Sequence, residues 1–145
     1  MKWRRISSGS FVNIEYETKE SNGQYLHLIK ILGPVGRAER MPVYNETLKL
    51  NLSADYFCIV DNSNGYESVL TFEDMLFFGD ILVKAGIKRF FSAVVTNDVG
   101  HVTIGKLTRA IAKTKNIYTE TYSASSYPNA EKFIMEKLAE AATSK

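Results

Sequence analysis

The second half of this chain alternates between short apolar runs and stretches with helical spacing. Residues 56–61, 88–96 and 117–122 predict three β-strands. Each run is followed by apolar residues spaced three or four apart, which is typical of an amphipathic helix. Such strand–helix units bury their apolar faces when crossover helices pack on a shared sheet. The sequence therefore predicts an α/β fold, a class that carries many unrelated activities.

The first third of the chain predicts two antiparallel strands joined by a tight turn. Residues 11–18 alternate between apolar and polar side chains, and residues 25–32 are apolar on both faces. Asn22 and Gly23 between them tolerate the positive φ angles of a hairpin turn. We expect this hairpin to open a mixed β-sheet whose other strands follow right-handed crossovers. The predicted order is ββαβαβαβα, in a single domain over residues 1–145 with its core at about 11–142.

Four segments predict the helices. Pro42 suits the first turn of the first helix, where its missing N–H costs nothing, and residues 37–41 before it fit either a loop or a short turn. Thr71 predicts the N-cap of the second helix and Gly86 its left-handed end. A third helix is expected over residues 99–115. The last helix is indicated by its apolar stripe: Ala130, Phe133, Ile134, Leu138 and Ala141.

Composition and charge exclude several classes of protein. The net charge is +2 with acids and bases interspersed, so no basic stripe for nucleic acid is present. No apolar run reaches the roughly 20 residues that span a bilayer, and residues 1–6 lack the apolar core of a signal peptide, so we expect a cytoplasmic protein. The single Cys58 is expected to be a small buried hydrophobe. His27 and His101 show no metal-ligand spacing, so we expect neither a metal nor a cofactor, and His27 reads as a packed strand residue.

Polar side chains follow the ends of the predicted strands. In open α/β sheets ligands bind at the carboxyl ends of the strands, beside helix N-termini. His101 is the best candidate for acid–base chemistry because its pKa lies near neutrality, and an enzyme would pair it with Asp61 or Asp98. The same residue types also cap helices and form turns, which is the alternative interpretation. The candidate ligand- or partner-binding residues are Asp61, Asn62, Ser63, Ser68, Thr71, Asn97, Asp98 and His101.

Known phosphate and hydrolase motifs are missing from this edge. Asp61 ends a strand as a phospho-acceptor aspartate of a receiver domain would. Residues 32–34, however, lack the acid pair that holds magnesium there, and residues 123–125 lack the expected lysine. No GxxxxGK[ST], GxGxxG or GxSxG pattern occurs. These absences exclude the receiver, nucleotide-binding and hydrolase interpretations.

With this strand order, the chain resembles STAS-type domains, particularly the SpoIIAA-like branch of small bacterial proteins. The resemblance rests on YFCIVD at 56–61, GIKRFFSAVV at 86–95, and Tyr122 followed by AEKFIMEKL at 130–138. It covers about residues 11–142 and implies a non-enzymatic binding or regulatory module. A second branch, the lipid-carrying STAS/SEC14-like domains, would require a deep apolar cavity.

The resemblance also implies where a switch would lie. In anti-sigma-factor antagonists of this family, a serine in an Asp-Ser-Ser-Gly run at the start of the following helix is phosphorylated to switch partner binding. Here the matching stretch reads ESVLTF at 67–72, so the run is missing and Ser68 and Thr71 are the candidate phosphorylation sites.

We expect the edge formed by residues 62–71 and 97–101 to bind a protein partner or a small ligand. Two alternatives stay open. One is a small enzyme that uses His101 at the same edge. The other is a homodimeric structural protein, motivated by three tyrosines interpreted as exposed aromatics: Tyr16, Tyr25 and Tyr127.

Overall fold

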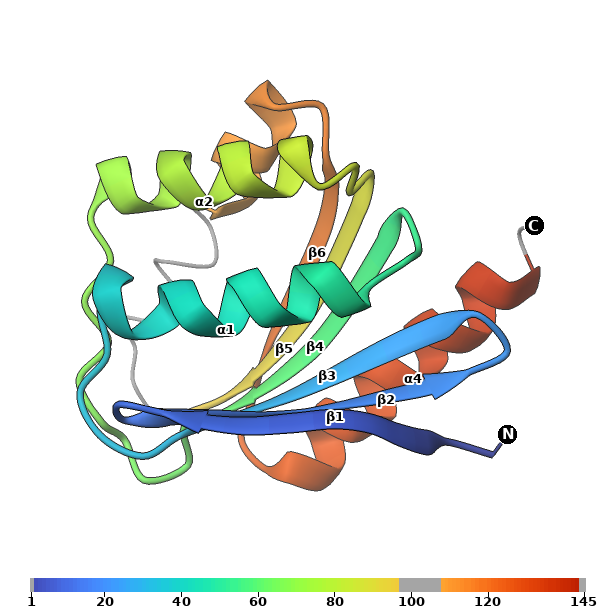
Figure 1. Ribbon diagram of the computed structural model, residues 1–145, viewed down its shortest axis with the longest axis horizontal. Helices are drawn as coiled ribbons and strands as arrows, with labels where there is room; N and C mark the ends of the chain where they lie inside the picture. The colour runs from blue at the N-terminus through green and yellow to red at the C-terminus, as the bar shows by residue number, and fades with distance from the viewer. Residues whose placement is uncertain (1, 97–107, 144–145) are drawn as a thin grey trace.

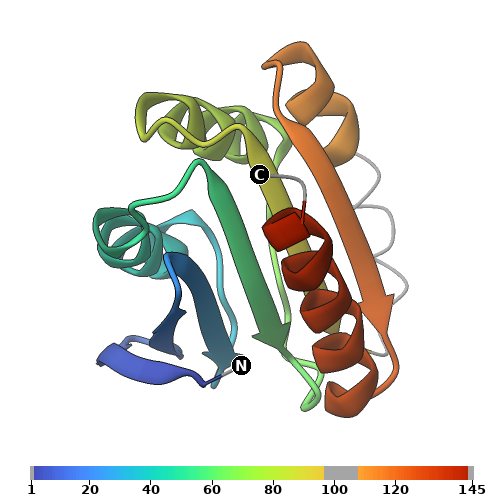
Figure 2. The same cartoon turned by 90° about the vertical axis from the view of Figure 1, so that its right-hand side faces the viewer.

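The computed structural model describes residues 2–96 and 108–143, in which six strands form one sheet with helices on both faces (Figures 1 and 2). The sheet order is β1-β2-β3-β4-β5-β6. Neighbours from β1 to β3 are antiparallel and those from β3 to β6 are parallel, which confirms the predicted mixed α/β sheet with crossover helices. The strands are β1 (Arg4–Phe11), β2 (Ile14–Ser21), β3 (Gln24–Ile31), β4 (Asp55–Asp61), β5 (Arg89–Val95) and β6 (Tyr118–Ala124). The helices are α1 (Arg37–Leu50), α2 (Phe72–Lys84) and α4 (Tyr127–Thr143), and residues 108–114 are also helical.

The sheet opens with one strand more than the predicted order. β1 pairs antiparallel with β2 along its whole length, so three strands, not two, precede the first crossover. The predicted single strand over residues 11–18 is interrupted by a turn, where Asn13 takes a φ of 62°. The sequence of β1, RRISSGSF, shows no clean alternation of apolar and polar side chains. The strand is therefore defined by its pairing with β2 and not by a local pattern.

Turn and cap residues behave as the sequence predicts. Asn22 and Gly23 have φ angles of 51° and 79° in the β2–β3 hairpin, and Gly86 has a φ of 82° after α2. The Thr71 hydroxyl accepts a hydrogen bond from Asp74 N at 3.0 Å, and the Asp74 carboxylate accepts one from Thr71 N at 3.0 Å. This reciprocal pair is a capping box that fixes the start of α2.

Helix α1 starts five residues before Pro42, so the placement of this proline in the first turn is wrong. The helix starts at Arg37 because Glu39 reaches back and accepts a hydrogen bond from Gly36 N at 2.6 Å. Pro42 then lies in the second turn, where it removes the bond that its N–H would give to the carbonyl of Ala38. Ala38 is exposed, so water can reach that part of the helix.

The core has one layer on each face of the sheet. On one face α1, α2 and the helical residues 108–114 cover side chains such as Tyr56 and Phe90. On the other face α4 lies across β4, β5 and β6 (Figure 2). The predicted stripe of α4 is confirmed, since Ala130, Ile134 and Leu138 are each 0% exposed.

Burial settles three further sequence expectations. Cys58 is buried as predicted, and burial raises the pKa of its thiol to about 12. His27 is packed inside the sheet layer, also as predicted. The interpretation of Tyr16 and Tyr25 as exposed aromatics is wrong, because only 6% and 9% of these residues is exposed. The Tyr16 ring stacks on Phe11 in the added strand, and its hydroxyl hydrogen-bonds Ser7 at 2.9 Å.

Candidate functional site

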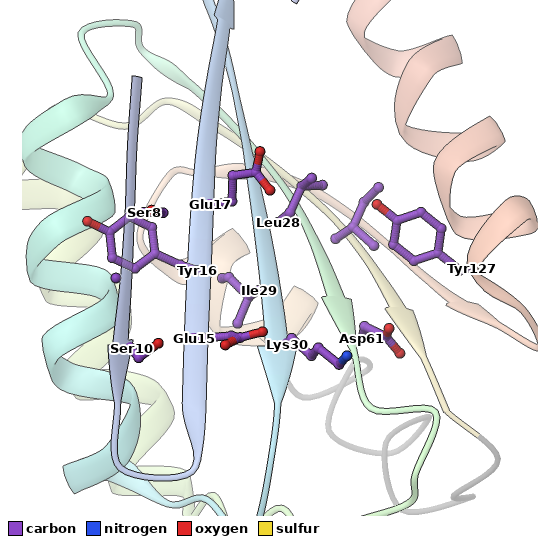
Figure 3. Close-up of a pocket in the computed structure, with 12 residues that line it drawn as sticks. Ser8, Ser10, Glu15, Tyr16, Glu17, Leu28, Ile29, Lys30, Asp61 and Tyr127 are labelled. Carbon is purple, nitrogen blue, oxygen red and sulfur yellow. The ribbon is translucent and has the colours of Figure 1, made fainter. Parts of the chain in front are cut away.

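The carboxyl end of β4 places neighbouring candidate residues in different surroundings. Asp61 reaches the α4 side of the sheet, where it lies among the residues of Figure 3. Its carboxylate also accepts a hydrogen bond from Ser63 N at 3.0 Å. Asn62 is 1% exposed, and its amide makes two hydrogen bonds to the backbone of Tyr66, at 2.9 and 3.0 Å. Asn62 therefore shapes the loop, whereas Ser63 is exposed.

The other candidate residues do not lie together at one site either. Ser68 lies beside α1, where its hydroxyl accepts a hydrogen bond from Arg40 Nη2. Thr71 has the capping contacts described above, so its hydroxyl is already in use. The three remaining candidates, Asn97, Asp98 and His101, lie outside the described residues.

A hollow of about 370 Å³ opens on the α4 side of the sheet, over the strands that α4 leaves uncovered (Figure 3). We call it the α4-side hollow. The register places Glu15 opposite Lys30, and Lys30 opposite Asp61, so these three side chains form a row across β2, β3 and β4. Its principal lining residues are Ser8, Ser10, Glu15, Glu17, Leu28, Lys30, Asp61 and Tyr127.

The α4-side hollow is polar and carries more acid than base. Glu15, Glu17 and Asp61 contribute carboxylates, and among the described lining residues only Lys30 contributes an ammonium group. Tyr127 closes the hollow at the start of α4, where burial raises the pKa of its hydroxyl and the nearby carboxylates of Glu131, Asp61 and Glu17 add to this effect. The hydroxyl is therefore neutral and able to donate a hydrogen bond. This arrangement suits recognition of polar and basic groups.

A second space, of about 130 Å³, lies on the opposite side of the sheet, between α1, the loop before α2 and strands β4 to β6. We call it the Arg40 chamber. Arg40 Nη1 donates to the carbonyl of Val35 at 3.4 Å, and Nη2 donates to Ser68. Burial lowers the pKa of this guanidinium and raises the pKa of the nearby Tyr44 hydroxyl to about 12. The polar and sulfur-bearing lining residues are Arg40, Tyr44, Cys58, Ser68, Ser92, Thr108, Thr121, Tyr122 and Ser123.

Sequence reasoning named Asp61 and Ser68 as candidates. It missed Lys30, which lines the α4-side hollow with Asp61, and Arg40, which lines the Arg40 chamber with Ser68. Lys30 had one available signal, since it is a charged residue in a mostly apolar strand. Arg40 had none, because it lies in the segment 37–41 whose structure the sequence left undecided. Within residues 2–96 and 108–143, no three His, Cys, Asp or Glu side chains are grouped closely enough to hold a metal ion.

Three antiparallel strands that continue into a parallel sheet, with helices on both faces, define the fold of this chain as SpoIIAA-like. The chain is similar to the crystal structure of an uncharacterized protein of the DUF3478 family with a SpoIIAA-like fold from Shewanella loihica PV-4. The TM-score is 0.53 at 12% sequence identity, and the match covers 89% of this chain and 98% of that one. At this identity the likeness concerns the fold alone. No family model matches the sequence, and no curated protein does.

The match agrees with the resemblance to STAS-type, SpoIIAA-like domains that the sequence indicates. None of the helices in the described part of the chain combines the length and the apolar character needed to cross a membrane.

Proposed function

We propose that this protein is a non-enzymatic binding or regulatory module that contacts a protein partner at the carboxyl edge of its sheet. The observation that carries the proposal is the α4-side hollow, which is built on the rigid strands β2, β3 and β4 and ends at Asp61. Rigid strands hold their side chains in a fixed pattern, which favours specific recognition over loose contact. Its three carboxylates and one ammonium favour a partner segment that presents basic side chains.

Reversing a charge in the α4-side hollow should weaken partner capture. We expect Asp61→Lys and Glu17→Lys each to reduce the recovery of a partner on the immobilised full chain by at least tenfold, because like charges would then face each other across the contact. Glu136→Lys is the matched control, since it makes the same charge change at an exposed position of α4. The measurement is quantitative copurification from cell extract at two salt concentrations. Equal recovery by all three variants and the unchanged protein would contradict the proposal.

A regulatory switch at Ser68 is the second part of the proposed function. The supporting observation is the hydrogen bond from the Arg40 guanidinium to the Ser68 hydroxyl. A phosphate on that oxygen would gain charge-assisted hydrogen bonds to Arg40, and such pairs order the loops that carry them. Thr71 is the less favoured candidate, because its modification would remove the cap of α2.

Ser68→Asp should change partner capture, whereas Ser68→Ala should leave it near the unchanged level. The added carboxylate would pair with Arg40 and reposition the loop before α2, which the neutral alanine cannot do. Asn45→Asp is the control because it introduces the same charge at an exposed position of α1, away from the candidate binding residues. Copurification of the three variants checks the prediction, and an identical yield from Ser68→Asp and the unchanged chain would remove the switch.

The alternative functions rest on fewer observations. An enzyme based on His101 with Asp61 or Asp98 stays a prediction, because His101 and Asp98 lie outside the described residues. The homodimer hypothesis loses two of its three motivating residues with the burial of Tyr16 and Tyr25.

A further inference from the structure

The Arg40 chamber holds a cation whose charge the described residues leave uncompensated. A guanidinium has five N–H donors. Across residues 2–96 and 108–143, Arg40 uses only two hydrogen bonds, both to neutral oxygens, on Val35 and Ser68. A partly buried charge without a partner is costly, and proteins normally place an anion beside it.

The nearest carboxylates are committed elsewhere. Glu39 accepts its hydrogen bond from Gly36 N at 2.6 Å, at the start of α1. Asp74 accepts one from Arg37 Nε at 2.6 Å and belongs to the capping box of α2. Both carboxylates raise the pKa of Arg40 against the larger effect of burial, but neither forms an ion pair with it. Neither carboxylate therefore occupies the place beside Arg40 where an anion would bind.

Neutral donors surround the same space. The hydroxyls of Ser92, Thr121 and Ser123 come from β5 and β6, and that of Tyr44 comes from α1. The Thr121 oxygen accepts a hydrogen bond from Nη1 of the exposed Arg109 at 2.9 Å and keeps its own proton to donate. The raised pKa of Tyr44 keeps its hydroxyl protonated. In the described part of the chain the Tyr44 hydroxyl has no hydrogen-bond partner, although its ring is packed on Phe78 at 4.9 Å between centroids. One cation with several neutral donors balances one negative charge, not two.

An apolar chamber of about 80 Å³ adjoins the Arg40 chamber. The two spaces share Tyr44, Leu70, Phe90 and Thr108 in their linings. The apolar chamber also contains Thr119, whose hydroxyl is buried and finds no hydrogen-bond partner among the described residues. Buried polar atoms of this kind are normally satisfied by a bound water or a ligand.

We propose that the Arg40 chamber and the adjoining apolar chamber together bind a small organic monocarboxylate. Its carboxylate pairs with the guanidinium of Arg40 and with the surrounding hydroxyls, and its short hydrocarbon part lies against Leu70 and Phe90. A phosphate dianion fits less well, because Arg40 is the only cationic side chain in the described lining and would leave one charge unpaired. This site lies on the opposite face of the sheet from the α4-side hollow, so the inference does not depend on the proposed partner contact.

Titration of the full chain with acetate, butyrate and inorganic phosphate at constant ionic strength tests this inference. Calorimetry or amide NMR shifts would report the binding. Butyrate should bind at one site and at least fourfold more tightly than acetate, which is the factor for burying one methylene group. Phosphate should bind more weakly than butyrate. Equal binding of acetate and butyrate, or tighter binding of phosphate, would overturn the assignment of ligand class.

Variants locate the site. Arg40→Met should weaken butyrate binding at least tenfold, while Arg37→Met, which removes the same charge three residues earlier in α1, should change it less than twofold. Ser68→Asp should also abolish butyrate binding, because the new carboxylate would pair with the Arg40 guanidinium. This second variant keeps the test decisive if Arg40→Met does not fold. Asp61→Lys should bind butyrate normally, which separates this result from the partner experiment. Unchanged binding in both Arg40→Met and Ser68→Asp would overturn the site.

Discussion

Replacing Leu138 by alanine is expected to destabilise the protein by about 3 kcal/mol, a value within the range for a fully buried leucine. Leu138 is 0% exposed and belongs to the cluster that joins α4 to the sheet, with Leu26, Phe57 and Phe91 on the strands. Alanine would leave a cavity at this junction, because strands on one side and a helix on the other cannot collapse onto it freely. The loss should appear in the free energy of unfolding measured with urea.

Leu52→Ala is the matched control for this experiment. Leu52 is 82% exposed, directly after α1, so the same chemical change there should alter the free energy of unfolding by less than about 0.5 kcal/mol. The slope of the unfolding free energy against urea concentration should be the same in both variants, since neither changes the surface exposed on unfolding very much. A cost below about 1 kcal/mol for Leu138→Ala would mean that α4 does not dock as described.

Local patterns in the sequence were sufficient for α4 and for the turns. The stripe from Ala130 to Ala141 repeats every three or four residues, and a helix with such a stripe has one face to bury. Asn22, Gly23 and Gly86 take the backbone angles that their residue types allow most easily. Each of these features depends on neighbours in the chain, so each can be predicted without the tertiary structure.

The two wrong predictions about the elements, the missing strand β1 and the start of α1, have different causes. β1 is a polar strand that exists because β2 pairs with it, and α1 starts early because Glu39 bonds to Gly36 N. The spacing of apolar residues along the chain indicates neither cause. Tertiary pairing therefore decided the added strand, and a local capping contact decided the start of α1.

The candidate site shows the same limit. Asp61 ends β4, and it faces the α4 side because successive side chains of a strand alternate between the faces of a sheet. Ser68 lies in the loop that follows, and the packing of that loop decides which space its side chain enters. Asp61 joins the α4-side hollow with Lys30, whereas Ser68 contacts Arg40 on the far side of the sheet. The contact between Ser68 and Arg40 spans 28 residues of sequence and requires α1 to pack beside the loop before α2. No spacing rule in the sequence predicts such a contact.

The stability of the protein is expected to fall by about 3 kcal/mol between pH 6.5 and pH 4 because of His27. Burial lowers the pKa of this imidazole from its ordinary 6.5 to about 4, and the hydrogen bond to Asn51 offsets only part of that effect. His27 Nε2 lies 2.9 Å from Asn51 Oδ1, and Nδ1 lies 2.8 Å from the Thr18 hydroxyl. The Asn51 amide nitrogen already donates to the carbonyls of Ser53 and Asp55, so Nε2 carries the proton and Nδ1 accepts from Thr18.

The direction of the effect follows from which state binds the proton. Between pH 6.5 and pH 4 the unfolded chain protonates His27 while the folded chain does not, so acid favours unfolding in this window. The gap of about 2.5 between the two pKa values, at about 1.4 kcal/mol for each pH unit, corresponds to about 3.5 kcal/mol in full. About 3 kcal/mol of this is lost between pH 6.5 and pH 4, because one titration is only half complete at each limit. Above pH 6.5 both states are neutral at His27, and below about pH 4 both are protonated, so this residue adds no pH dependence outside the window.

His27→Gln tests the assignment, because glutamine can still donate to Asn51 and accept from Thr18 but does not titrate. The variant is expected to be less stable than the unchanged protein at pH 7.5, since it loses the ring that stacks on Tyr56 at 4.5 Å. Its stability should nevertheless fall by about 3 kcal/mol less than that of the unchanged chain between pH 7 and pH 4. Urea unfolding at several pH values measures both curves, and their difference removes the contribution of carboxylates that titrate in both proteins. Parallel curves would show that His27 is not the buried base responsible.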